Sequence, residues 1–414
     1  DEGSIPFTRS RFDVPLAARD PPNPAQLKGS GCVVSDLGMN TPPAPSYRST
    51  LLIGLVALAV AMGVGRFAFT PLMPLMVRDV TLDAATGAEW AAANYAGYLV
   101  GALSASWFAR SPRVGLQLGL LGVAVSTLGM AWADLSPAWL GAWLRGLSGV
   151  CSAWVMVCAS SWCLPELARR GAAAMSGWMY CGVGVGIVLT GTLSWLGGHQ
   201  LAWVLWIELA LLAALGAACV RWALPHSAEV PSGPVAKGVQ ASAPTVPRHS
   251  LGLILCYGAF GYGYIVPATF LPTMARQLVD DPLIFGLTWP LFGLAAAVSV
   301  ALASRWLAGW PRQQVWAGAQ ALMAVGTLIP LLQQSLWGLA LSAILVGGTF
   351  MVATMAGLQL ARERMPANPT PLLARMTGAF AAGQMAGPLL VRLMASQNVT
   401  QAEALYLANG LATL

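Results

Sequence analysis

The chain has 414 residues, of which 57% are hydrophobic and only 9% are charged, and its mean hydropathy is +0.65. A soluble domain carries about 25% charged residues, so most of this chain cannot face water and a soluble enzyme is excluded. The net charge of +6 does not indicate nucleic-acid binding, because the basic residues stand singly between apolar runs. Six of the seven cysteines lie inside apolar segments without metal-ligand spacing, so we predict no metal, no cofactor and no structural disulfide.

Residues 1–48 differ in kind from the rest of the chain. They contain Pro21, Pro22 and Pro24, mixed charges and no hydrophobic periodicity, which predicts a disordered extension. Met39 lies a short distance before the first apolar segment, so we expect it to be the natural start and residues 1–38 to be dispensable for folding and function. A genuine disordered tail is the alternative.

Eleven later segments are apolar and long enough to cross a hydrocarbon layer about 30 Å thick, which takes about 20 helical residues. A twelfth segment begins near Ala402, and we expect it to be cut short at Leu414, because its thirteen residues reach only about 20 Å. The eleven segments are 51–74, 88–109, 114–133, 138–163, 172–197, 200–221, 251–273, 283–304, 313–332, 336–360 and 371–395.

The basic residues between the segments are divided unevenly between the two sides of the predicted membrane. From Met39 onward, thirteen Lys and Arg residues lie on the side where the first segment begins and three lie on the other. The positive-inside rule then places both termini in the cytoplasm and the protein in a plasma membrane, in bacteria the inner membrane. The three on the outer side are Arg78, Arg276 and Arg392.

The two halves of the chain repeat each other at an offset of 198 residues. The segment from Gly63 to Arg78 shares two glycines, a proline, a methionine and an arginine with the segment from Gly261 to Arg276. A repeat of about 200 residues between membrane bundles is typical of secondary transporters. We therefore predict an all-α membrane protein of twelve helices, with bundles over 49–221 and 250–414 related by a pseudo-two-fold axis and joined by a Pro-rich cytoplasmic linker over 222–249.

Arg66, Arg145 and Glu208 are charged residues inside predicted membrane segments, each about eight residues from the same membrane surface. Charges at this depth are costly and commonly functional. We predict that the three converge on one polar site, either as a structural ion pair of Glu208 with an arginine or as a pathway for a charged substrate or protons. Two arginines against one glutamate favour an anionic substrate, and Glu208 is the acidic candidate for proton coupling.

Uncharged polar residues in the segments are weaker candidates for the same pathway, with helix–helix hydrogen bonding as the alternative for each. These are Asn94, Tyr98, Tyr180, Tyr257, Tyr264 and Gln384. The repeated glycines and prolines are predicted to bend or break the first and seventh helices and to act as a hinge or gate. These are Gly63, Gly65, Pro71, Pro74, Gly261, Gly263, Pro267 and Pro272.

The glycine run Gly182-x-Gly184-x-Gly186 has no preceding strand and lies inside an apolar segment, so we interpret it as a site of close helix packing and not as a dinucleotide fingerprint.

The segment Gly63-Val-Gly-Arg66-Phe-Ala-Phe-Thr-Pro-Leu-Met-Pro74 resembles the helix 1 signature of the YbfB/YjiJ-like group of the major facilitator superfamily. Arg145, with Gly149 four residues later, resembles a helix 4 motif that the superfamily links to proton-coupled transport. Helix 5 lacks the Gly-Pro of the drug-antiporter motif, and residues 101–113 lack the acidic residue of the usual gating motif.

The resemblance implies a permease that moves a small organic solute by alternating access, coupled to protons, with efflux favoured over uptake. Its expected partners are the lipid bilayer, a small-molecule substrate and protons, without nucleic acid, and it is expected to be a monomer. A membrane sensor or assembly factor that retained the fold without transport is the alternative. A membrane enzyme would need clustered carboxylates, His or Cys, which the segments lack.

Overall fold

The computed structural model describes residues 47–108, 111–135, 137–172, 175–224, 250–365, 370–395, 397 and 399–414. The predictions made for residues 1–46 and for 225–249 lie outside these ranges. The first half of the described chain is helical throughout and makes six passages. The elements are α1 (Tyr47–Leu58), η2 (Ala59–Phe67) and α2 (Phe69–Arg78), then α3 (Ala84–Ser104) with η3 (Ala105–Phe108), α4 (Pro112–Gly129) with η4 (Met130–Leu135), α5 (Ala138–Arg169), α6 (Ser176–Leu196) and α7 (Ala202–Ala223).

The second half of the described chain makes six more passages, of which the last is the short helix expected near Ala402. Every predicted segment corresponds to an observed helix or helix pair, so the predicted all-α twelve-helix fold is confirmed. The elements are α8 (Leu251–Leu278), α9 (Pro282–Phe285) with α10 (Thr288–Trp306), α11 (Arg312–Leu332), α12 (Leu336–Arg364), α13 (Thr370–Ala395) and α14 (Gln401–Thr413).

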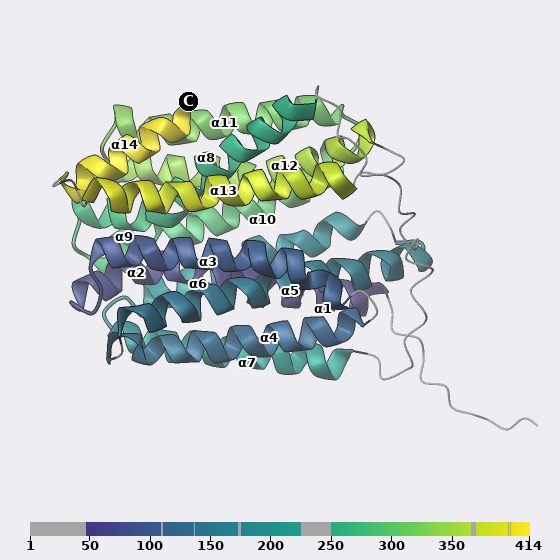
Figure 1. The fold of residues 1–414 in the computed structure, drawn as a ribbon, viewed down its shortest axis with the longest axis horizontal. Helices are drawn as coiled ribbons and strands as arrows, with labels where there is room; N and C mark the ends of the chain where they lie inside the picture. Colours follow the sequence, from purple (N-terminus) through teal and green to yellow (C-terminus); the bar gives the residue numbers. More distant parts are fainter. Residues whose placement is uncertain are drawn as a thin grey trace, which may run out of the picture. The chain divides into compact units, whose positions relative to one another are not determined.

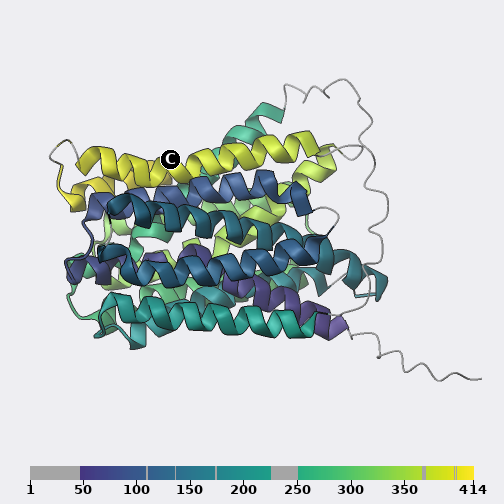
Figure 2. The same ribbon diagram turned by 60° about the horizontal axis from the view of Figure 1, so that its bottom comes forward.

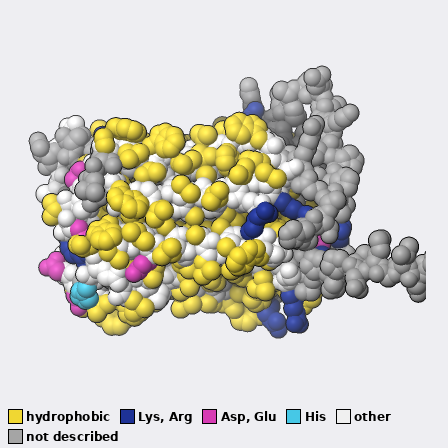
Figure 3. Space-filling view, turned by 90° about the horizontal axis from the view of Figure 1, so that it is seen from below, with side chains coloured by type: hydrophobic (Ala, Val, Ile, Leu, Met, Phe, Trp, Pro, Cys, Tyr) yellow, Lys and Arg dark blue, Asp and Glu magenta, His cyan; other side chains and the backbone are white. Residues whose placement is uncertain are grey.

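Nine helical passages of the described chain are long and apolar enough to cross a membrane. The helices α3 and α13 have sufficient length but lower apolarity, and they pack against each other, so part of each surface faces protein instead of lipid. On the face shown in Figure 3, hydrophobic side chains cover the middle, basic side chains gather at one end and acidic side chains at the other. This distribution is that of an integral membrane protein.

The two halves lie against each other along several helix pairs. In Figure 1 the helices α1 to α7 occupy one side of the picture and α8 to α14 the other. Contacts between the halves join α6 to α10, α3 to α13 and α2 to α8, and Figure 2 shows α13 beside α3. An ion pair of Glu89 with Arg392, 2.5 Å long, adds a partly exposed link between α3 and α13.

The contact between α6 and α10 follows a seven-residue period of glycines. A Cβ atom on Gly184 would lie 2.4 Å from the backbone nitrogen of Ala297. One on Gly177 would lie 2.4 Å from the Ser304 Oγ atom, and one on Gly191 would lie 2.9 Å from Pro290. The residue numbers of the glycines on α6 rise in steps of seven, while those of their partners on α10 fall in steps of seven. The two helices are therefore antiparallel and stay in register along a left-handed seam.

This seam predicts opposite effects for two glycine-to-alanine substitutions. Gly184→Ala should lower the free energy of unfolding by about 1–3 kcal/mol, because the added methyl group overpacks a backbone contact. Gly318 has open space around its position on α11, so Gly318→Ala should be neutral or stabilising by up to about 1 kcal/mol. Thermal unfolding in detergent measures both. Equal unfolding temperatures for the two variants would contradict the seam.

Candidate site at the interface of the two halves

The first membrane passage is interrupted by a π-helical segment that carries Arg66. The segment η2 runs from Ala59 to Phe67 and joins the α-helices α1 and α2. Its glycines let neighbouring helices touch the backbone, because a Cβ on Gly63 would lie 2.4 Å from Gly186 of α6 and one on Gly65 would lie 2.3 Å from Ser152 of α5. The predicted break in the first helix is therefore present, as a π-helix.

Side chains from α5 and α3 bind the carbonyl oxygens of this segment. Ser148 donates to the Gly65 oxygen over 2.7 Å, and Arg145 donates through Nη1 to the same oxygen over 3.2 Å. Through Nη2, Arg145 also donates to the Arg66 oxygen over 2.9 Å. Asn94 Nδ2 donates to the Gly65 and Arg145 oxygens over 3.3 and 2.9 Å.

Pro71 explains why the Arg66 carbonyl needs a donor from a side chain. In a π-helical register the Arg66 carbonyl would pair with the backbone N–H five residues later, and proline has none. In the apolar interior of a membrane protein, an unpaired carbonyl costs several kcal/mol. The guanidinium of Arg145 supplies the missing donor, so Arg145 positions the backbone from which the Arg66 side chain projects.

The side chain of Arg66 reaches across to the second half of the chain. Its Nη2 atom donates to the Tyr264 hydroxyl over 3.1 Å. Its guanidinium carbon lies 4.2 Å from the ring centroid of Tyr98 and 5.5 Å from that of Tyr95, both on α3. Arg66 is only 3% exposed, and its Nε atom has no hydrogen-bond partner.

Arg66 and Tyr264 occupy equivalent positions of the two repeats, 198 residues apart. Thr70 donates to the Ala268 oxygen over 2.9 Å at the same offset. Two equivalent positions can touch only close to the axis that relates the repeats, so both contacts lie near the pseudo-two-fold axis between the halves.

The expected ion pair of Glu208 with an arginine is absent from the described residues. The ion pairs found there join Arg78 to Asp79, Glu166 to Arg169 and Arg170, and Arg392 to Glu89. Glu208, on α7, is partly exposed. Arg66 and Arg145 are both buried, and neither is neutralised by a carboxylate in the described chain. Their similar depth along the helices is therefore not accompanied by an ion pair between Glu208 and either arginine in the described chain.

The second half contributes an aromatic wall to the site. The ring of Tyr264 lies parallel to those of Phe350 and Phe380, with centroid distances of 5.4 and 5.6 Å and an interplanar angle of 8° in each case. Gln384 donates its amide N–H to the Tyr264 hydroxyl, and its own oxygen has no partner. Phe350 also meets Phe67 of η2 at 6.2 Å, which continues the wall into the first half.

The remaining predicted residues differ in their relation to this site. Tyr98 and Gln384 belong to it. Tyr180 hydrogen bonds to Ser160 over 3.1 Å, and Tyr257 packs on Phe380 and on Trp316 of α11. The seventh helix is not broken, since α8 is one α-helix that contains Pro267 and Pro272, and a bend there stays a prediction. Membrane helices tolerate such prolines where neighbouring groups satisfy the backbone. The hinge and gate roles stay predictions.

The sequence analysis missed Tyr95, Phe350 and Phe380. Tyr95 joins the halves through a 2.7 Å hydrogen bond to Thr269. The repeat offset contained a signal for Phe350, because Ser152 stands 198 residues before it and contacts η2 through the Ala61 oxygen over 2.8 Å.

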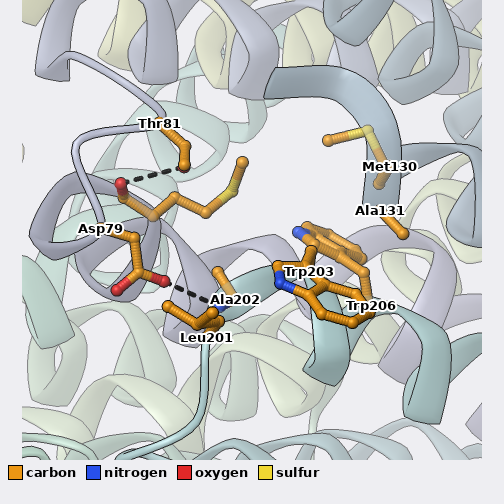
Figure 4. A pocket seen from close by; sticks show the side chains of 9 residues that line it. Asp79, Thr81, Met130, Ala131, Leu201, Ala202, Trp203 and Trp206 are labelled. Carbon is orange, nitrogen blue, oxygen red and sulfur yellow. Dashed lines mark hydrogen bonds between the residues drawn. The ribbon is translucent and has the colours of Figure 1, made fainter. Parts of the chain in front are cut away.

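A separate cavity of about 190 Å³ lies at the end of the first half where α2 stops (Figure 4). Asp79 accepts a 2.7 Å hydrogen bond from the backbone N–H of Ala202 and so holds the start of α7. Thr81 donates to the Met76 oxygen over 3.1 Å. Asp79 is also paired with Arg78. The polar groups that line this cavity therefore hold helices together and leave no free charge for a ligand.

A helical fold of two repeats that meet at a pseudo-two-fold axis is the fold of the major facilitator type. The profile of the family described as "MFS_4: Uncharacterised MFS-type transporter YbfB" matches residues 58–414. The chain therefore belongs to this family and is an integral membrane transporter.

Solved structures of transporters share the fold. A D-xylose–proton symporter is 12% identical, with a TM-score of 0.66 over 89% of this chain and 96% of that chain. The nucleoside transporter NupG is 13% identical, with a TM-score of 0.65 over 88% and 96%. The human organic anion transporter MFSD10 (TETRAN) is 16% identical, with a TM-score of 0.62 over 89% and 98%. No curated protein sequence matches the chain.

The geometry makes Arg145 a positioning residue with a testable signature. Arg145→Ala should abolish transport and lower the free energy of unfolding by about 1–3 kcal/mol, the cost of an unsatisfied buried carbonyl. Arg145→Lys should retain less than about half of the transport, because one ammonium cannot reproduce the fork that binds two carbonyls. Transport by purified protein in liposomes and unfolding in detergent measure the two effects.

Arg221→Ala is the matched control, because Arg221 is exposed and makes only a 3.5 Å contact with Gln117. Full transport by Arg145→Ala would contradict the positioning role. Rescue of its stability by Glu208→Gln would reveal an ion pair that the structure does not contain.

Proposed function

We propose that this protein is a secondary active transporter of a small organic anion and that Arg66 binds the anionic group at the pseudo-two-fold axis. The observation that carries the proposal is a pair of buried guanidinium groups near this axis without a carboxylate partner in the described chain. Alternating access exposes the interface between the halves to each membrane side in turn, so a group on the axis can meet a substrate from both.

The energetics support a ligand for Arg66. Burying an ion without a counter-ion costs several kcal/mol even after the protein relaxes. The cation–π contact with Tyr98 at 4.2 Å offsets only about 0.5–2 kcal/mol of this cost. Both arginines keep an Nε atom without a partner, but Arg145 commits Nη1 and Nη2 to backbone carbonyls, whereas Arg66 binds through Nη2 a hydroxyl that an anion can displace. An anionic substrate would supply the missing counter-charge.

The polar composition of the axis also favours a carrier over a sensor that only retains the fold. A sensor can fill the interface with apolar side chains. Here Arg66, Tyr264 and Gln384 stand at the interface, and two of them keep a buried polar atom without a partner. Unsatisfied groups of this kind are costly in the interior and are commonly kept for binding.

Substitution of Arg66 should change function and stability in opposite directions. Arg66→Gln should reduce carboxylate transport at least about 30-fold, which corresponds to about 2 kcal/mol of binding energy. The same variant should unfold at a higher temperature in detergent, because an uncompensated buried charge is removed. Arg66→Lys should be intermediate in transport.

The assay is counterflow in liposomes after a thermal-shift screen with sodium acetate, succinate, benzoate and gluconate against sodium chloride. Arg221→Gln is the control for loss of a surface charge. Wild-type transport rates in Arg66→Gln would refute the proposal.

Proton coupling through Glu208 and export as the direction complete the proposal. Glu208 is partly exposed on α7 and forms no ion pair within the described chain, so its carboxylate is available to a proton. Export is the direction favoured by the family resemblance.

If Glu208 carries the proton, Glu208→Gln should abolish accumulation driven by a pH gradient while leaving counterflow, which needs no net proton movement, within about twofold of wild type. Glu89→Gln is the control, because Glu89 is an exposed carboxylate paired with Arg392. Retention of gradient-driven accumulation in Glu208→Gln would assign coupling to another group. Inside-out and right-side-out vesicles compared under the same gradient give the direction.

A further inference from the structure

We propose that the anion recognised at Arg66 is an aromatic carboxylate, whose ring binds to the aromatic wall of the second half. This inference rests on the proposed function and specifies its substrate class. It is carried by the contacts of one side chain, Tyr264, whose ring and oxygen are held by different partners.

Tyr264 shows which ligand the site can hold. Its planar ring stacks on Phe350 and on Phe380, at an interplanar angle of 8° and centroid distances of 5.4 and 5.6 Å. Its oxygen receives N–H groups from Arg66 and Gln384. An aromatic ring stacked on two phenylalanines, with an oxygen directed at a guanidinium and an amide, has the same arrangement of groups as a bound benzoate.

The surroundings of Arg66 extend this selectivity to the first half. The guanidinium carbon lies 5.4 Å from the ring centroid of Phe67, 5.5 Å from that of Tyr95 and 4.2 Å from that of Tyr98. A carboxylate bound here is therefore surrounded by aromatic rings from both halves. These rings are uncharged, so its ionic partner is the Arg66 guanidinium. Aromatic pairs gain energy beyond their apolar area, which an alicyclic ring of equal size cannot obtain.

The tyrosine hydroxyl is a neutral competitor for the same guanidinium. A carboxylate forms charge-assisted hydrogen bonds with arginine that are about twice as strong as neutral ones. The arriving anion therefore displaces the Tyr264 hydroxyl from Arg66 and breaks a direct hydrogen bond between the halves. Binding of the aromatic acid is in this way linked to separation of the halves at the axis.

The test measures dissociation constants of the purified full-length chain in detergent by calorimetry, with four probes. Sodium benzoate carries ring and charge, sodium cyclohexanecarboxylate carries the charge on an alicyclic ring, benzyl alcohol carries the ring alone, and sodium acetate carries the charge alone. Benzoate should bind about tenfold more tightly than cyclohexanecarboxylate, and benzyl alcohol should bind at least about a hundredfold more weakly than benzoate.

Two variants test the assignment to named residues. Phe350→Leu should remove the preference for benzoate over cyclohexanecarboxylate while leaving cyclohexanecarboxylate affinity within about twofold, because only the ring contact is lost. Tyr264→Phe should tighten benzoate binding, because the competing hydroxyl is gone. Phe108→Leu is the control, since Phe108 makes an edge-to-face contact with Trp154 at 5.1 Å within the first half.

The outcomes separate this inference from the proposed function. Equal affinities for benzoate and cyclohexanecarboxylate in the wild-type chain would overturn the aromatic class and leave the anion site standing. No binding of any carboxylate, or benzoate binding unchanged in Arg66→Gln, would overturn both. Should Phe350→Leu not fold, the wild-type comparison of the four probes still decides the inference.

Discussion

The need to satisfy backbone carbonyls inside a membrane determines the arrangement of the site. The first passage contains Pro71 and a π-helical segment, so its carbonyls cannot all be paired within the helix. Arg145, Ser148 and Asn94 supply the donors from two neighbouring helices. This fixes the direction in which Arg66 leaves its helix, and with it the place where a positive charge meets the second half of the chain.

The two repeats have a similar arrangement of helices, but the side chains that they bring to the site differ in chemical type. The first half brings the guanidinium groups and the small hydroxyl residues that contact the π-helical segment, and the second half brings the rings of Tyr264, Phe350 and Phe380. Because the axis places equivalent positions face to face, this difference sets the guanidinium groups of the first half against the stacked rings of the second. The seam of α6 and α10 holds the halves close beside it.

The sequence predicted the helices well because each passage is a long apolar run. The charged residues within the passages and the offset between the two repeats could also be identified directly from the sequence. It predicted the importance of Arg66 and Arg145, since buried charge is rare in such runs. It did not show that Glu208 lacks an ion pair with an arginine in the described chain, because depth along a helix does not report direction around it. It also did not decide between a bent and a broken seventh helix, and α8 is one continuous helix that contains Pro267 and Pro272. The sequence did not predict the aromatic wall, because phenylalanine is common in membrane segments. Only their contacts with Tyr264 distinguish Phe350 and Phe380 from other phenylalanines.

The central claim is that Arg66 is the binding group for an anion at the axis. The most direct measurement is a crystal structure of the chain with 4-iodobenzoate, located by the anomalous scattering of iodine. The account predicts the carboxylate within about 2.7–3.2 Å of the Arg66 guanidinium and the iodinated ring against Phe350 or Phe380. Iodine found only in the cavity beside Asp79, or only on the lipid-facing surface, would contradict it.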